Sequence, residues 1–132
     1  MIEFHLDPGS GVPAYLQIVQ QVRQAVSLGI LRAGDQLPTV KQAVGALAIN
    51  PNTVLKAYRE LEHAGVVEAR RGQGTFVASG VAGPSEERDY RPLRGELVSW
   101  LARARAAGLD DEAIRALVAS TLRTELSVRA VA

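Results

Sequence analysis

The sequence predicts a mainly α-helical protein with one small β-hairpin, made of an N-terminal domain and a shorter C-terminal pair of helices. Apolar residues recur at three- and four-residue steps in several stretches, which is typical of amphipathic helices. Two short β-branched runs flank a glycine-rich turn, and a segment rich in glycine, proline and charge separates the two parts. The chain of 132 residues is 47% apolar and has no cysteine, so we expect a packed core without disulfides or thiolate metal sites.

The first two helices are expected on either side of a turn. Pro13 can begin the first helix, because the first helical turn has spare amide groups, and Gly29 can end it. Residues 31–38 contain Gly-Asp and Leu-Pro pairs, which are typical of turns. Thr39 can then cap a second helix that continues to Leu47.

A third helix and a hairpin are expected next. Asn50 can cap the third helix, Pro51 presets the backbone of its first turn, and Gly65 can end it. The β-branched runs 66–69 and 75–78 flank the sequence Arg-Arg-Gly-Gln-Gly. This pattern predicts a hairpin with a basic, glycine-rich tip.

A short helix, a tight turn and a well-capped second helix form the arrangement that places the second helix in the major groove of DNA. Asn52 and Thr53 lie in the first turn of the third helix, and Lys56 follows within one turn. Their amide, hydroxyl and ammonium groups can contact bases or phosphates. Capping alone explains Asn50, and core packing is the preferred role of Tyr58, but both are included as candidate contacts.

The hairpin tip supplies a second candidate contact with DNA. Arg70 and Arg71 precede Gly72, whose lack of a side chain lets the backbone approach a sugar-phosphate edge. The whole chain carries a net charge of only +1, but residues 39–75 contain five basic and three acidic residues. We therefore predict a winged helix-turn-helix that binds double-stranded DNA over residues 1–78.

The C-terminal part is predicted to dimerise the protein. Residues 79–91 have no apolar periodicity and are interpreted as a linker, and residues 92–132 are interpreted as a two-helix dimerisation domain. Two helices alone bury little apolar surface, so their apolar sides need either the first domain or a second copy of the chain. The apolar residues expected at this interface are Leu93, Leu97, Trp100, Leu101, Ile114, Leu117, Val118 and Leu122.

Catalytic, metal-binding and membrane roles have little support in the sequence. The two histidines, His5 and His63, are far apart in the chain, and no serine lies in a nucleophile-elbow motif. No apolar run approaches the ~20 residues of a membrane-spanning helix, and the first residues lack the pattern of a secretory signal. We expect a cytoplasmic protein that is not an enzyme and has no cofactor, metal ion or membrane partner.

Residues 13–77 resemble the DNA-binding domain of the GntR family of bacterial transcription regulators. The resemblance is carried by three strings: PAYLQIVQQVRQAV, LRAGDQLPTVKQAV and INPNTVLKAYRELEHAGVVEARRGQGTFV. The last string is the most specific, because helix start, helix stop and wing occur in fixed order. The short two-helix tail is similar to that of the YtrA-type branch. In that branch the tail dimerises the protein, and the regulated genes often encode ABC transporters.

The resemblance also implies which side chains contact DNA. Thr39 and Lys41 stand where the family has serine and arginine, and a lysine neutralises a phosphate but does not grip a guanine with two hydrogen bonds. Leu55 stands where many members have a polar or basic residue. The full set of expected contacts is Thr39, Lys41, Asn50, Asn52, Thr53, Lys56, Tyr58, Arg70, Arg71, Gly72 and Gln73.

Together these observations predict a sequence-specific DNA-binding transcription regulator. We expect a homodimer that binds a pseudo-palindromic operator and represses transcription, with an ABC transporter operon as a candidate target. A small-molecule effector is compatible with the sequence, but no cluster of polar residues identifies its site. The alternative is a winged-helix module that binds another protein and not a specific DNA sequence.

Overall fold

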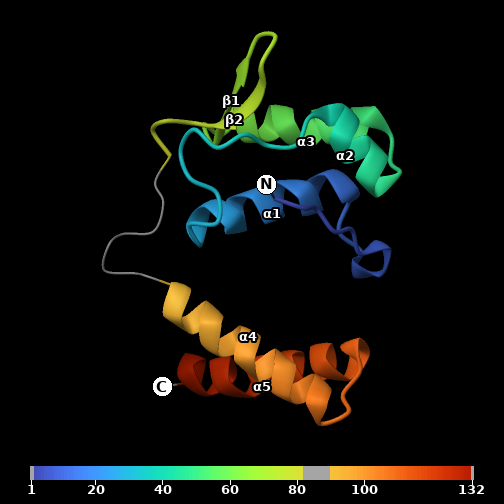
Figure 1. Ribbon diagram of the computed structural model, residues 1–132, viewed down its shortest axis with the longest axis vertical. Helices are drawn as coiled ribbons and strands as arrows, with labels where there is room; N and C mark the ends of the chain where they lie inside the picture. The colour runs from blue at the N-terminus through green and yellow to red at the C-terminus, as the bar shows by residue number, and fades with distance from the viewer. Residues whose placement is uncertain (1, 82–89, 132) are drawn as a thin grey trace. The chain divides into compact units, whose positions relative to one another are not determined.

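The computed structural model describes residues 2–81 and 90–131 and divides into two units, Met1–Asp89 and Tyr90–Ala132 (Figure 1). The first unit contains three α-helices, a 3-10 helix at Pro8–Ser10 and a two-stranded antiparallel hairpin, and the second contains two α-helices. The predicted fold class, mainly helical with one small hairpin, is confirmed. The division between the units falls inside the expected linker 79–91, of which residues 82–89 lie outside the described residues.

The helices of the first unit begin at the positions where the sequence supplies caps. Helix α1 spans Ala14–Ser27, α2 spans Val40–Leu47 and α3 spans Pro51–His63. Thr39 forms a capping box with Gln42, since each residue's side chain accepts a hydrogen bond from the other's backbone N–H. These reciprocal bonds satisfy amide groups that the start of α2 would otherwise leave unpaired.

The turn between α2 and α3 contains an unusual backbone conformation. Ala48 has a φ of 54°, in the left-handed region that residues with a Cβ rarely adopt. Its N–H donates to the carbonyl of Val44 at 2.8 Å, which closes the end of α2. The chain therefore reverses within a few residues, and α3 starts immediately afterwards at Pro51.

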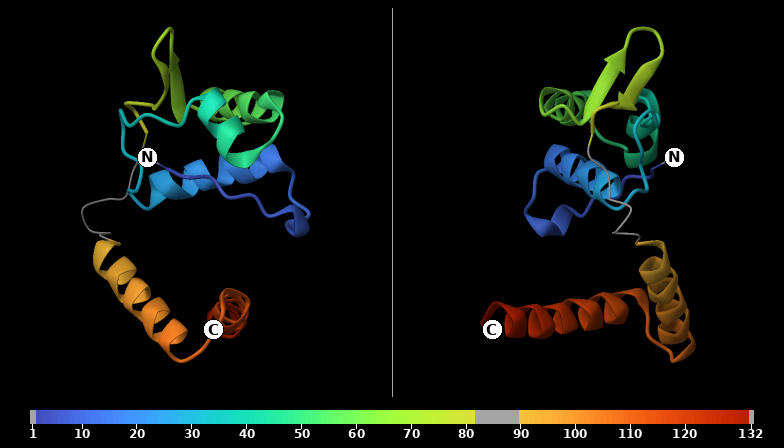
Figure 2. Two further views of the ribbon diagram at one scale, coloured as in Figure 1. Left: turned by 45° about the vertical axis from the view of Figure 1, so that its right-hand side comes forward. Right: turned by 90° about the vertical axis from the view of Figure 1, so that its left-hand side faces the viewer.

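The core of the first unit lies between α1, α3 and the hairpin, as Figure 2 shows from two sides. Its largest fully buried side chains come from all of these elements and from the segment before α2: Ile18, Val22, Leu37, Val54, Leu61 and Val77. Burial of each such side chain contributes ~1.5–3 kcal/mol, so this cluster holds α3 firmly against α1.

Tyr58 fixes α3 to the segment that precedes α2. Its side chain is only 6% exposed, and its hydroxyl donates to the carbonyl oxygen of Pro38 at 2.5 Å. Burial raises the pKa of Tyr58 well above its ordinary value, so the phenol stays protonated and remains a donor. The ring of Phe4 contacts the Tyr58 ring edge-on, with centroids 6.5 Å apart.

The N-terminal arm is fastened to α1 by two glutamine side chains, a feature that the sequence did not reveal. Gln21 accepts from the N–H of His5 and donates to the carbonyl of the same residue. Gln17 does the same with Asp7 and is itself buried. These bonds satisfy the backbone of an extended segment and let Phe4 reach the core.

Both strands of the hairpin lie one residue nearer the turn than the expected ranges 66–69 and 75–78, so the turn is shorter than predicted. Strands β1, Val67–Arg70, and β2, Gly74–Val77, pair so that Arg70 lies opposite Gly74. The segment 34–37, which was interpreted only as a turn, pairs with the outer edge of β2 through a bridge between Gln36 and Phe76. The hairpin is therefore held by backbone bonds on both sides of β2.

The second unit consists of α4, Arg91–Ala106, and α5, Asp111–Val131. Its first helix begins one residue before the expected boundary at 92, and Asp110 caps α5 by accepting from the N–H of Ala113 at 2.8 Å. Among the side chains described in this unit, only Ala104 and Ile114 are buried. Both lie near the connection between the helices, so most of the two helices' apolar surface is open to solvent.

Replacing Tyr58 with phenylalanine tests the contact between α3 and Pro38. The substitution leaves the ring in the core but removes the hydroxyl donor, which should lower the free energy of unfolding by about 1 kcal/mol. Denaturant titration followed by circular dichroism measures this change. Tyr15→Phe is the matched control, because that half-buried ring should lose less than about 0.5 kcal/mol. Equal midpoints for Tyr58→Phe and the unmodified protein would contradict this role of the hydroxyl.

Candidate nucleic-acid interface

The outer side of α3 is a polar stripe. Asn52, Lys56, Arg59 and His63 are all exposed and follow one another at helical spacing. They lie on the side of α3 opposite its buried residues. Those buried residues are Val54, Ala57, Tyr58 and Leu61. The stripe therefore gives α3 a row of hydrogen-bond donors and positive charge that faces away from the core.

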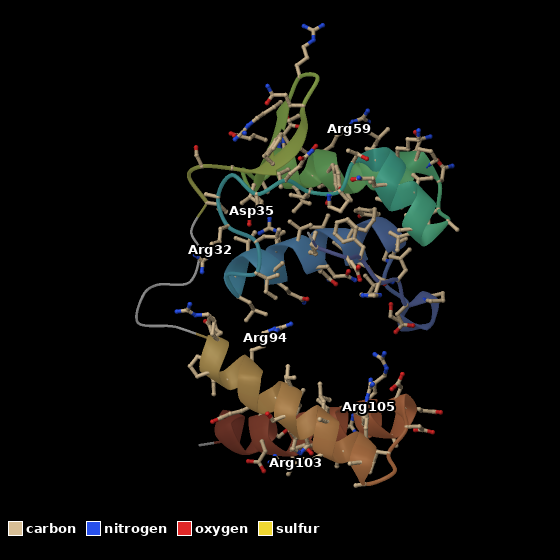
Figure 3. All side chains as sticks on the ribbon, viewed as in Figure 1. Arg32, Asp35, Arg59, Arg94, Arg103 and Arg105 are labelled. Atoms are coloured by element: carbon tan, nitrogen blue, oxygen red, sulfur yellow. The ribbon has the colours of Figure 1, made fainter. Side chains whose placement is uncertain are left out.

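Arg59 belongs to this stripe but was not among the residues expected to contact DNA. Figure 3 shows Arg59 on α3, extending away from α1. The signal that could have found it was its spacing, because Arg59 follows Lys56 by three residues and so shares its side of the helix. Arg59 is one of the five basic residues between Thr39 and Thr75.

The start of α3 combines capping with free donor groups. The side-chain oxygen of Asn50 accepts from the N–H of Asn52 at 2.8 Å, so this oxygen is occupied by the helix cap. The amide nitrogen of Asn50 still carries two donors, and the side chain of Asn52 is exposed. Thr53 is half-buried beside them. The end of the helix that would enter a groove is thus both rigid and polar.

Helix α2 contributes two of the expected contacts. The hydroxyl oxygen of Thr39 accepts from the N–H of Gln42 at 3.1 Å, and its proton is free to be donated elsewhere. Lys41 is exposed on the first turn of α2. Among the ion pairs found in residues 2–81, none involves Lys41. Both side chains are therefore accessible to a phosphate.

The hairpin tip is a tight turn supported by Gln36. Gly72 has a φ of 75°, which favours glycine, and the N–H of Gln73 donates to the carbonyl of Arg70 at 2.9 Å. The side chain of Gln36 donates to the carbonyl of Gln73 at 3.2 Å. Gly74 has a φ of 125°, which favours glycine, and a Cβ there would also lie 2.7 Å from the side-chain nitrogen of Gln36 and displace it. Gln36 therefore supports the backbone of the turn, and the residues of the turn itself, 71–73, are exposed to solvent.

The two arginines of the tip differ in their surroundings. Arg70 pairs with Glu68 through nitrogens at 2.9 and 3.3 Å, and its guanidinium lies 4.2 Å from the centroid of the Phe76 ring. Arg71 is exposed at the turn itself, and within the described part of the chain it makes no ion pair. Arg71 is therefore the cation of the tip that is immediately available to a phosphate.

Lys56 contacts α1 as well as solvent. Its ammonium nitrogen lies 4.0 Å from the centroid of the Tyr15 ring, which is the geometry of a cation–π interaction. Tyr15 stands in the first turn of α1. The interaction therefore joins the start of α1 to the second turn of α3.

Tyr58 does not belong to this surface. Its ring is buried and its hydroxyl is occupied by Pro38, so the structure contradicts its inclusion among the DNA contacts. Core packing, the role preferred for it above, is the one observed. Tyr58 contributes to the interface only by holding α3 in place.

The exposed parts of α3 and the hairpin lie on a common side of the first unit. The buried side of α3 packs towards α1, and the hairpin projects from α3 away from α1 in each view (Figures 1 and 2). The polar stripe and the tip with Arg71 can therefore face the same surface. This is the arrangement with which a winged helix-turn-helix contacts a duplex.

Metal-binding clusters and membrane-spanning helices are both absent from the described residues. No group of three or more His, Cys, Asp or Glu residues within 2–81 and 90–131 is placed to hold a metal ion. No helix in the same ranges is long and apolar enough to cross a membrane. His5 and His63 are both exposed.

Residues 14–77, from the first residue of α1 to the last of β2, match the family model described as "Bacterial regulatory proteins, gntR family". The "HTH-type transcriptional repressor YtrA" of Bacillus subtilis is 36% identical over 107 residues, which cover 81% of this chain and 82% of that protein. That match is longer than the 89-residue first unit and so extends into the second.

Solved structures show the same likeness. "YtrA from Sulfolobus acidocaldarius, a GntR-family transcription factor" is 30% identical with a TM-score of 0.55, covering 75% of this chain and 97% of that one. A transcriptional regulator from Oenococcus oeni is 33% identical with a TM-score of 0.53, covering 89% and 97%. These relatives are transcription regulators and not enzymes. The chain belongs to the GntR family and is a transcription regulator with a DNA-binding domain.

Proposed function

We propose that the protein is a repressor that binds a pseudo-palindromic operator as a homodimer, with α3 of each subunit in a major groove. The observation that carries this proposal is the polar stripe of α3 beside the hairpin tip. Asn52 and Thr53 would read base edges at the start of the helix, and Lys56, Arg59 and Arg71 would hold phosphates. Repression is supported by the name of the YtrA relative, which is a transcriptional repressor.

The second unit supports the dimer. Six of its large apolar side chains are exposed in the single chain, with fractions between 44% and 62%: Leu93, Leu97, Val98, Leu117, Leu122 and Leu126. Of the eight residues expected at a dimer interface, Ile114 is buried and Trp100, Leu101 and Val118 are half-buried. The other four are exposed: Leu93, Leu97, Leu117 and Leu122. Burying contiguous apolar area against a second copy would be favourable by ~25 cal/mol per Å².

A dimer also fits the geometry of a symmetric operator. Two recognition helices enter successive major grooves when they are about one helical turn, ~34 Å, apart. A pair of second units joined around a twofold axis would supply two first units to the two half-sites. A small-molecule effector, if the protein has one, would act by changing the spacing between the two α3 helices.

The genes under control are proposed from the family branch alone. The YtrA-type tail suggests an ABC transporter operon, and the regulator would then act in the cytoplasm. Selection of bound fragments from the host genome tests this, because the neighbouring genes of the recovered fragments would identify the target. Fragments without transporter genes nearby would reject the assignment while leaving the DNA-binding proposal intact.

A winged helix that binds another protein is the second candidate. Protein interfaces are enriched in aromatic and apolar residues at their centre. The outer side of α3 instead presents Asn52, Lys56, Arg59 and His63. This composition favours DNA. A gel-shift assay against random-sequence duplex at low salt separates the two, since a module specific for a protein partner would not retard the duplex.

The DNA contacts can be tested by substitution and salt titration. Lys56→Ala and Arg71→Ala should weaken binding to all sequences and make the salt dependence shallower, because each removes a phosphate contact. Asn52→Ala and Thr53→Ala should instead lower the preference for particular base pairs by ~1–3 kcal/mol. Fluorescence anisotropy with the selected operator and with random duplex measures both effects.

The matched control for these variants is Arg23→Ala, which removes one positive charge from an exposed position of α1 outside the proposed surface. It should leave the sequence preference and the salt dependence unchanged. With six to eight phosphates neutralised by the dimer, wild-type affinity should fall ~10³-fold or more between ~50 and ~200 mM salt. A flat salt dependence, or equal losses in Arg23→Ala and Lys56→Ala, would reject the contact surface.

Leu97→Asp tests the dimer. Leu97 is 52% exposed in the single chain, so the substitution should not unfold α4 but should place a charge in the proposed interface. We expect a dimer for the wild-type protein and a monomer for Leu97→Asp by sedimentation equilibrium at micromolar concentration. Ser99→Asp, an exposed position on the opposite side of α4, should remain dimeric. A monomeric wild-type protein would refute the proposal.

A further inference from the structure

We propose that Tyr15 is a positioning residue of the DNA interface, which acts by holding the Lys56 ammonium in place before DNA binds. The inference rests on the proposed function, because it concerns the same surface. It assigns a role to a residue of α1, a helix otherwise outside that surface. No direct contact between Tyr15 and DNA is invoked.

The contact on which the proposal depends is the cation–π interaction between the two side chains. The ammonium nitrogen of Lys56 lies 4.0 Å from the centroid of the Tyr15 ring. Charge over the face of an aromatic ring is attracted by the ring's quadrupole. Lys56 is otherwise exposed, so this ring is the feature that restricts where its charge resides.

Tyr15 is well suited to this role because its own position is fixed. The ring is half-buried and packs against the hydrophobic core. It stands in the first turn of α1, where the backbone is set by the preceding Pro13. The Tyr15 ring is therefore fixed by α1 and the core, and it restricts the position of the flexible Lys56 side chain.

Holding the Lys56 side chain in place before binding reduces the conformational entropy that it loses when it contacts a phosphate. The side chain has four rotatable carbon–carbon bonds, and ordering it on a phosphate costs conformational entropy at the moment of binding. A lysine already held over a ring has lost part of that entropy before DNA arrives. Removing the ring should therefore weaken the phosphate contact even though Lys56 itself is intact.

The ring does not compete with DNA for the ammonium. An ammonium group carries three N–H donors, and a ring face occupies only one side of it. The remaining donors of Lys56 point away from the ring and can bond to phosphate oxygens. The same lysine can therefore contact Tyr15 and a phosphate at once.

The test compares Tyr15→Phe with Tyr15→Leu in the full-length protein, using a fluorescent random-sequence duplex at low salt. Tyr15→Phe keeps the ring face and should bind like wild type. Tyr15→Leu keeps an apolar side chain but removes the ring, and should weaken binding by about two- to fivefold per subunit. The salt dependence of Tyr15→Leu should also be shallower, which a purely structural role would not produce.

A double-mutant cycle with Lys56→Met shows whether Tyr15 acts through Lys56. In the Lys56→Met background, Tyr15→Leu should have no further effect on affinity or salt dependence. An equal loss in both backgrounds would overturn the proposal. So would an unchanged affinity for Tyr15→Leu, or a Tyr15→Phe variant as weak as Tyr15→Leu, since the latter would mean that the hydroxyl contacts DNA.

A measurement without DNA separates this proposal from the proposed function. The ring current of Tyr15 should shift the ε-protons of Lys56 upfield in the NMR spectra of wild type and Tyr15→Phe, and the shift should vanish in Tyr15→Leu. If the shift is present but wild type does not bind duplex, the proposed function fails and the positioning role fails with it. If wild type binds duplex but the shift is absent, only the positioning role is overturned.

Discussion

The burial of one side of α3 is the constraint on which the rest of the first unit depends. Val54 and Leu61 are fully buried against the core, and Tyr58 joins the helix to Pro38. A helix fixed in this way cannot rotate about its axis without exposing apolar surface, so its opposite side is equally fixed. Asn52 and Arg59 owe their outward direction to residues that never reach the surface.

The position of the hairpin is fixed mainly by backbone hydrogen bonds. A two-stranded hairpin alone is marginally stable in water. Here the segment that includes Gln36 pairs with β2, and the Gln36 side chain also binds the carbonyl of Gln73. This isolated bridge and the Gln36 side chain brace the two-stranded hairpin from the outer edge of β2, which supports the turn that carries Arg71.

Local sequence chemistry was enough to predict the helices. Thr39 and Asn50 cap amide groups within three residues of themselves, and glycines end α1 and α3 through their own backbone conformation. Such signals need no knowledge of the fold. The hairpin was predicted with an error of one residue, because alternation of side chains does not specify which residues close the turn.

What the sequence did not reveal depends on contacts between distant segments. The pairing of Gln36 with Phe76, the anchoring of the arm by Gln17 and the contact of Tyr15 with Lys56 each join residues that are far apart in the chain. Core packing was the preferred role of Tyr58, and it was kept among the candidate DNA contacts because the sequence could not show that Pro38 occupies its hydroxyl. Arg59 shares one side of α3 with Lys56, a relation that their three-residue spacing already indicates.

The support given to the wing by Gln36 also limits where the chain can vary. Gly72 and Gly74 both have a positive φ that favours glycine, and a side chain at Gly74 would also displace the Gln36 amide. Exchanges at Arg71 and Gln73 would change what the tip presents without disturbing the sheet beneath it. The exposed side chains of the turn can therefore change while the backbone that supports them stays the same. Related regulators could differ in operator choice through these side chains and retain one scaffold.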